Sequence, residues 1–101
     1  MQEEFDLETI LSVIARYNIT HDYNNILKLY SFMFENPDLS INEFLKKYEI
    51  GRKHILSLYP ELNDIDFDYH YLDSYVKKQR QKFGDKLLIT TIKGKEFILK
   101  K

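Results

Sequence analysis

Apolar residues recur at helical spacing through the first part of the chain. This spacing predicts one helix over residues 5–17 and a second over residues 22–35, each with one apolar face. Asn36-Pro37 ends the second helix, because the residue before a proline resists the helical conformation. The side chains predicted to face inward are Phe5, Ile10, Leu11, Ile14, Ile26, Leu27, Tyr30, Met33 and Phe34.

The stretch that begins at Ser40 has the pattern of two short helices joined by a tight turn. Ser40 and Glu43 form a capping box, in which each side chain satisfies amides of the first helical turn. Tyr48-Glu49-Ile50 is predicted to make the turn, and Gly51 to cap the second helix, at about 51–59. The inner face of the first helix is predicted to hold Ile41, Phe44, Leu45 and Tyr48.

The second of these helices leaves cationic and polar side chains on its outer face. A helix that enters the DNA major groove makes most of its base contacts through its N-terminal residues. The residues predicted to contact bases are Arg52, Lys53, His54 and Ser57, with Leu56 as a further candidate.

Residues 40–62 as a whole resemble the helix-turn-helix of bacterial, phage and archaeal transcription regulators. With the segment before them, from Ile26 through Asn36-Pro37-Asp38-Leu39-Ser40-Ile41, they are most similar to the DNA-binding end of tetracycline-repressor-type regulators. The resemblance implies DNA binding by the residues just named. It implies no ligand sensing, because the chain is too short for the ligand-binding half of that family. The sequence departs from the family at Leu45, where a small alanine is preferred, and at Glu49, where the turn usually has glycine.

A further helix is predicted over residues 69–83, with Gly84 as its C-terminal stop. Cations crowd its last turns, and two interpretations stay open. The cations form either a phosphate clamp beside the recognition helix or a solvated face that complements the negative end of the helix dipole. These cations are Lys77, Lys78, Arg80 and Lys82.

Near the end of the chain the pattern changes to that of a strand. Residues 87–92 are rich in β-branched side chains, Lys93-Gly94 is a plausible two-residue turn, and residues 96–99 would return as a partner strand. The sequence therefore predicts a C-terminal β-hairpin.

A hairpin after a helix-turn-helix resembles the wing of winged-helix proteins. On this interpretation residues 86–100 form the wing, and Lys93 and Lys95 contact phosphate. A competing resemblance, in which Thr91 caps a final helix, leaves residues 95–101 open between strand and helix. The predicted fold class is thus mainly α, with one helix-turn-helix domain over residues 1–101 and a winged-helix-like hairpin.

Composition narrows the class of protein. A chain of 101 residues that is 44% hydrophobic is expected to form one globular domain. It has no cysteine, no signal-peptide pattern at the N-terminus and no apolar run of the length that a membrane helix needs. A soluble, cytoplasmic protein without membrane contact is therefore expected.

Charge is divided unevenly, although the net charge is only −1. Residues 1–50 hold four Lys and Arg against nine Asp and Glu, whereas residues 51–101 hold eleven against seven. Phosphate contacts need local positive charge only, so the basic half is expected to face DNA. Ordinary surface patterning is the alternative.

Signals for catalysis and for metal binding are weak. His21, His54 and His70 lack the spacing of metal ligands, and no glycine-rich phosphate loop or nucleophile motif is present. The acidic connector at residues 63–68 lacks the glycine and glutamate positions of a calcium loop, so helix capping by Asp66 or Asp68 explains it better. We expect no enzyme activity, no cofactor and no metal.

Two functions follow from the pattern. The first is a small sequence-specific regulator of transcription that binds double-stranded DNA as a homodimer, because one recognition helix reads too few base pairs. The alternative is a protein-binding module, such as a phage-encoded inhibitor or adaptor, on a degenerate trihelical fold. The acidic half and the eight tyrosines favour this alternative.

Overall fold

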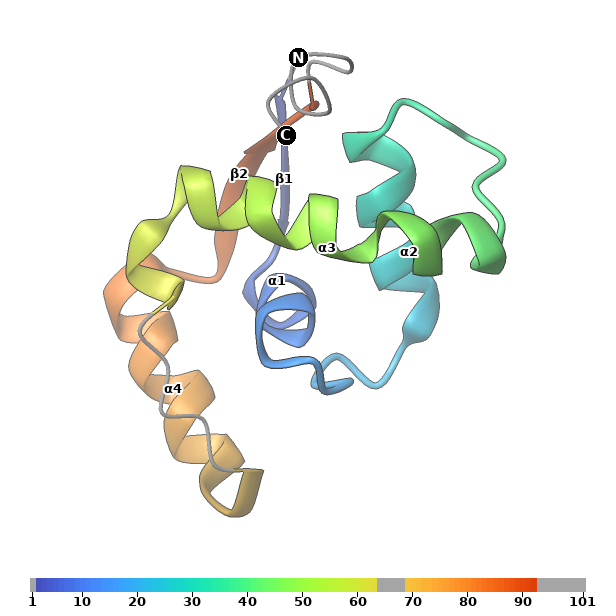
Figure 1. The fold of residues 1–101 in the computed structure, drawn as a ribbon. Helices are drawn as coiled ribbons and strands as arrows, with labels where there is room; N and C mark the ends of the chain where they lie inside the picture. The colour runs from blue at the N-terminus through green and yellow to red at the C-terminus, as the bar shows by residue number, and fades with distance from the viewer. Residues whose placement is uncertain (1, 64–68, 93–101) are drawn as a thin grey trace.

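The computed structural model of the chain describes residues 2–63 and 69–92. Its elements are β1 (Gln2–Asp6), α1 (Leu7–Ala15), α2 (Tyr23–Met33), α3 (Ile41–Leu58), η1 (Pro60–Asn63), η2 (Tyr69–Tyr71), α4 (Leu72–Phe83) and β2 (Lys86–Thr90). The described residues thus form four α-helices, two short 3₁₀ helices and one two-stranded antiparallel sheet (Figure 1). The mainly helical fold class with a small sheet is confirmed.

Helix α1 is the centre of the core. It lies between α2 and α4, below α3, and next to the sheet (Figure 1). Because other elements surround it, it has almost no polar face. Its buried residues are Leu7, Thr9, Ile10, Leu11, Ser12, Val13 and Ile14.

The sheet joins the two ends of the described chain. β1 pairs with β2 in antiparallel register, with Gln2 opposite Thr90 and Asp6 opposite Lys86. The Leu7 amide then donates to the Asp85 carbonyl at 2.8 Å, where the chain leaves β1 for α1. The predicted start of the first helix at Phe5 is therefore wrong, because pairing with β2 holds that residue in a strand.

The predicted C-terminal hairpin is confirmed only as far as its first strand. β2 has the expected alternation, with Leu87 and Ile89 buried and Leu88 exposed. Its partner is β1. The proposed Lys93-Gly94 turn and the return strand at residues 96–99 lie outside the described residues.

Helix α3 is continuous across the predicted turn, so the separate recognition helix at residues 51–59 is a wrong prediction. Tyr48-Glu49-Ile50 is helical, and Gly51 is buried in the middle of the helix. A Cβ atom at Gly51 would lie 2.4 Å from Cε2 of the Tyr30 ring. The glycine therefore lets α3 approach α2 closely and caps nothing.

Several of the signals predicted to start or end a helix are confirmed. Ser40 and Glu43 form the complete capping box of α3, with backbone-to-side-chain distances of 3.1 and 3.2 Å. The hydrogen bond from the Ser40 amide lowers the pKa of Glu43. Helix α3 ends at Leu58, just before Pro60, and Gly84 follows α4 with a φ of 90°.

A cluster of rings fixes α2 against α3. Tyr30 is fully buried, and its ring lies 4.8 Å from that of Phe44 and 6.0 Å from that of Tyr48, measured between centroids. Its hydroxyl donates to the Tyr48 carbonyl at 2.6 Å, and the Tyr48 hydroxyl donates to the Val13 carbonyl at 2.5 Å. Burial raises the pKa of both tyrosines.

Candidate functional site

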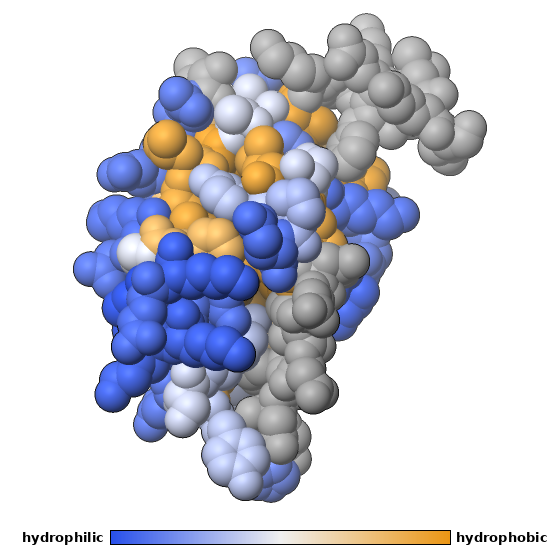
Figure 2. Space-filling model, turned by 90° about the vertical axis from the view of Figure 1, so that its left-hand side faces the viewer, coloured by the Kyte–Doolittle hydropathy of each residue, from blue (hydrophilic) through white to orange (hydrophobic). Residues whose placement is uncertain are grey.

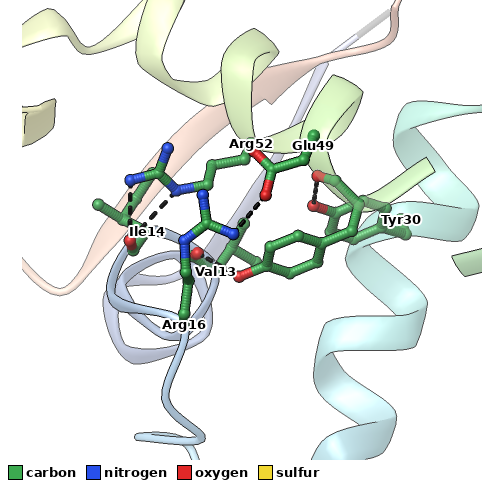
Figure 3. Close-up of polar contacts among 7 residues, drawn as sticks. Val13, Ile14, Arg16, Tyr30, Glu49 and Arg52 are labelled. Carbon is green, nitrogen blue, oxygen red and sulfur yellow. Dashed lines mark hydrogen bonds and ion pairs between the residues drawn. The ribbon is translucent and has the colours of Figure 1, made fainter. Parts of the chain in front are cut away.

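The residues predicted to contact DNA bases lie on the second half of α3, and three of them contact the fold itself. Nε and Nη2 of Arg52 donate to the backbone oxygen of Ile14 at 3.3 and 3.2 Å (Figure 3). Nε2 of His54 lies 2.7 Å from the backbone oxygen of Thr90. The Ser57 hydroxyl donates to the His54 carbonyl at 2.6 Å.

Arg52 acts as a cap for α1. The last carbonyls of a helix lack partners within the helix, and a cation is favoured at its negative end. The guanidinium of Arg52 meets both needs and is only partly exposed. Among the predicted contacts on α3, Lys53 and Ser57 are exposed.

His54 of α3 and Tyr59, the residue after α3, also cover one edge of β2. The Tyr59 hydroxyl donates to the Leu88 carbonyl at 2.9 Å, while His54 contacts the Thr90 carbonyl. These two carbonyls are two residues apart and leave the same edge of the strand. His54 and Tyr59 therefore occupy groups that would otherwise be open to another strand.

The basic run on α4 is only partly available to an outside partner. Arg80 forms ion pairs with Glu8 at 3.3 Å and with Asp85 at 2.8 Å, so it ties α4 to the rest of the fold. Figure 2 views the molecule from the side of α4 and shows hydrophilic side chains over the lower left of this face. Lys93 and Lys95 lie outside the described residues. The exposed lysines of α4 are Lys77, Lys78 and Lys82.

An apolar groove that the sequence interpretation missed opens between the end of α1, the start of α2 and the first half of α3. Its volume is about 290 Å³. We call it the tyrosine groove and divide its principal residues into a floor and a rim. The floor is Val13, Ile26, Phe44 and Tyr48. The rim is Arg16, Tyr17, Tyr23 and Leu45.

The rim exposes large side chains that usually lie inside proteins or interfaces. Leu45 is 62% exposed, Tyr17 is 44% exposed and Tyr23 is 40% exposed. Ile41, one turn before Leu45 on α3, is 54% exposed. The prediction that Ile41 and Leu45 face inward is therefore wrong, because the other α3 face packs on the core. Large apolar groups left outside a core mark interaction surfaces.

The connection from α1 to α2 is held so that Tyr17 lies outside. Arg16 ends α1 with a positive φ of 58°, and the Tyr17 amide then donates to the Ser12 carbonyl. The buried Ser12 hydroxyl accepts the amide of Ile19 at 2.9 Å, and Ile19 is buried. At the far end of the connection, Tyr23 begins α2, and its ring meets that of Phe44 edge-on.

Arg16, on the rim of the groove, forms an ion pair. Arg16 binds Glu49, and its guanidinium lies 5.7 Å from the centroid of the Tyr48 ring (Figure 3). The hydrogen bond between the two charged groups raises the pKa of Arg16 and lowers that of Glu49. Both side chains are about half exposed, so the pair adds little stability but orders this part of the rim.

The described residues contain no group of three or more histidine, cysteine, aspartate or glutamate side chains placed to hold a metal ion. Within the same ranges, no helix has the length and apolar content needed to span a bilayer. No family model, curated protein or solved structure matches the chain.

Proposed function

We propose that this chain is a protein-interaction module that docks a protein partner in the tyrosine groove. The observation that carries the proposal is an apolar floor bordered by exposed Tyr17, Tyr23 and Leu45. Tyrosine is enriched at the centres of protein interfaces, where its ring buries apolar area and its hydroxyl finds a polar partner.

The roles of Arg52 and His54 also favour this function over base recognition by α3. Each contacts a backbone oxygen of another element, so a base edge would have to compete with an existing hydrogen bond. Leu45, on the rim of the groove, requires no such exchange, because its side chain is apolar and 62% exposed. A partner in the groove gains from the burial of side chains that already lie open to water.

The size of this gain sets the role of the groove within an interface. Complete burial of one large apolar side chain is worth roughly 1.5 to 3 kcal/mol, and Tyr17, Tyr23 and Leu45 are each about half exposed. Burial of these side chains therefore contributes roughly 2 to 4 kcal/mol to the binding free energy, which is comparable to the contribution of a hot spot in an interface. Further contacts around it must complete the affinity.

A binding experiment with a matched pair of variants tests the proposal. The wild-type chain, Leu45→Lys and Leu88→Lys serve as baits, and each retained protein is then purified and titrated against all three by calorimetry. Leu88 is 44% exposed on β2 and lies outside the groove. We expect wild type and Leu88→Lys to bind with equal affinity, and Leu45→Lys to bind at least tenfold more weakly.

The proposal fails if Leu45→Lys binds every purified partner, including a second copy of the chain, as tightly as wild type does. Circular dichroism of the three baits checks that each is folded. Both substituted positions are exposed, so neither lysine has to enter the core.

Binding of double-stranded DNA is the second candidate function, and α4 is its best location. Lys77, Lys78 and Lys82 are exposed on one helix, and within the described residues no ion pair engages Lys77 or Lys78. Exposed lysines on a helix favour contact with phosphate, which carries no sequence information by itself. A regulatory role, a cytoplasmic location and the absence of enzyme activity stay predictions.

A further inference from the structure

We propose that the partner in the tyrosine groove is a second copy of this chain, bound about a two-fold axis beside the first half of α3. This inference rests on the proposed function and names the partner for the same surface.

The groove and the exposed face of α3 beside it together contain both halves of a self-complementary contact. Leu45 and Ile41 project from α3, and the hollow beside them is bordered by Tyr17 and Tyr23. In a two-fold interface the same patch lies on both sides, so each projecting group must meet a hollow of that same patch. A patch with a hollow alone would need a projecting group from an unrelated protein. Here the chain supplies both.

The projecting side chains stand on a rigid element. Ile41 and Leu45 are four residues apart, which places them on the same face of α3 as a short ridge. The capping box at Ser40 and Glu43 fixes the first turn from which this ridge starts. Two copies of α3 can then pack against each other, with the ridge of one copy beside the tyrosines of the other.

Charge around the groove permits two copies to meet. Arg16 and Glu49 form an ion pair on its rim, and the neighbours of the rim residues in the chain add Asp22 and Lys46. These two cations and two anions balance, so identical patches face each other without net repulsion. A surface of one sign would repel its own copy. The exposed lysines of α4 form such a surface, so α4 is not the contact.

Sedimentation velocity of the wild-type chain from about 1 to 500 µM tests the inference, because a hot spot of this size suits a weak dimer. We expect a monomer–dimer equilibrium that Leu88→Lys leaves unchanged. Leu45→Lys is expected to weaken it at least tenfold, because the two-fold axis brings the new charges of both copies together.

A cross-linking experiment gives a second, positional readout. The chain has no cysteine, so each single-cysteine variant carries one defined thiol. A disulfide forms only where the two Cα atoms approach within about 7 Å. We expect at least one of the variants Ile41→Cys and Leu45→Cys to oxidise to a covalent dimer ten or more times faster than the control Leu88→Cys.

The inference is overturned if the wild-type chain stays monomeric throughout the concentration range, or if Leu45→Lys dimerises like wild type. Equal oxidation rates for all three cysteine variants also count against it. Failure of the proposed function looks different. If the chain is monomeric but a purified partner loses affinity with Leu45→Lys, the groove is a docking site for another protein, and only the second copy is wrong.

Discussion

Gly51 and Arg52 are adjacent in the sequence, and both hold α3 against the rest of the fold. Gly51 lies under the ring of Tyr30, and Arg52 binds the carbonyl of Ile14 on α1. Neither role has a local signal, because each depends on a residue that lies far away in the chain. From the sequence, Gly51 was predicted to cap a helix that begins there, and Arg52 was predicted to contact bases from its first turn.

Substitution of Gly51 by alanine tests whether α3 packs closely on α2 at this position. Alanine stabilises a free helix interior by about 1 kcal/mol relative to glycine. Here the new methyl group would meet the ring of Tyr30, which is fully buried and hydrogen-bonded through its hydroxyl. Overpacking of a core typically costs about 1 to 3 kcal/mol. We expect the free energy of unfolding, measured in urea, to fall for Gly51→Ala, by up to about 2 kcal/mol.

Lys53→Ala is the matched control, because Lys53 is exposed on the same helix two residues later. We expect its effect to stay within about 0.5 kcal/mol of wild type. An increase in stability for Gly51→Ala would contradict this close packing, because it would mean that the new methyl group meets open space instead of the ring of Tyr30.

At the scale of elements, signals that act within a few residues predicted the structure well. The capping box, the stop before Pro60 and the glycine after α4 concern only neighbouring backbone groups, and all three are confirmed. The predicted turn inside α3 was wrong. Glycine can either cap a helix or allow two helices to approach closely, and at Gly51 the position of Tyr30 decides for the close approach. β1 was missed because Gln2–Asp6 has one apolar side chain, and its strand conformation comes from pairing with β2.

The tyrosine groove was missed for a related reason. Leu45 has helical spacing with Phe44 and Ile41, so the sequence assigned all three to one inner face. A helix buries about one face, and here Phe44 lies in the core while Leu45 and Ile41 remain exposed.

The start of α3 should depend on pH through Glu43. The hydrogen bond from the Ser40 amide favours the ionised carboxylate and lowers the pKa of Glu43 in the folded chain. A carboxylate with a lowered folded pKa contributes stability above its unfolded pKa, and this contribution is lost as the pH falls through the folded value. Glutamine keeps the shape of the capping box but not the charge.

We therefore expect Glu43→Gln to be less stable than wild type at pH 7, and the difference to shrink below about pH 4, where the carboxylate of the unfolded chain takes up a proton. Urea unfolding of both proteins at pH 7, 5 and 3 measures this difference. If it stays constant over the whole range, the charge of Glu43 does not contribute to the start of α3.

At the scale of the whole molecule, the first and last described elements lie side by side. The pairing of β1 with β2 places the acidic residues of Gln2–Asp6 beside the segment that follows α4 (Figure 1). The charge division seen along the sequence is therefore partly cancelled in space. Lys86 lies 3.7 Å from Asp6, and Arg80 binds Glu8. The lysines of α4 that remain exposed are the basis of the second candidate function.

The same argument predicts how the chain would bind duplex DNA. Contacts by exposed lysines release counterions from the duplex, so the affinity falls steeply with salt. The logarithm of the association constant should change with the logarithm of salt concentration by about −0.9 for each phosphate contacted. We expect Lys77→Glu/Lys78→Glu to make this slope shallower by about two and to weaken binding at least tenfold at 50 mM salt, measured by fluorescence anisotropy.

Lys53→Glu is the control that separates α4 from α3, since Lys53 is exposed on the helix that was expected to read bases. If phosphate contact runs through α4, Lys53→Glu changes the slope by less than about one, and exchange of the duplex sequence changes affinity little. If Lys53→Glu abolishes binding and Lys77→Glu/Lys78→Glu leaves the salt slope unchanged, the DNA contact lies on α3 instead of α4. If Arg52 also contacted bases, it would have to leave the carbonyl of Ile14, so DNA binding would then weaken the cap on α1.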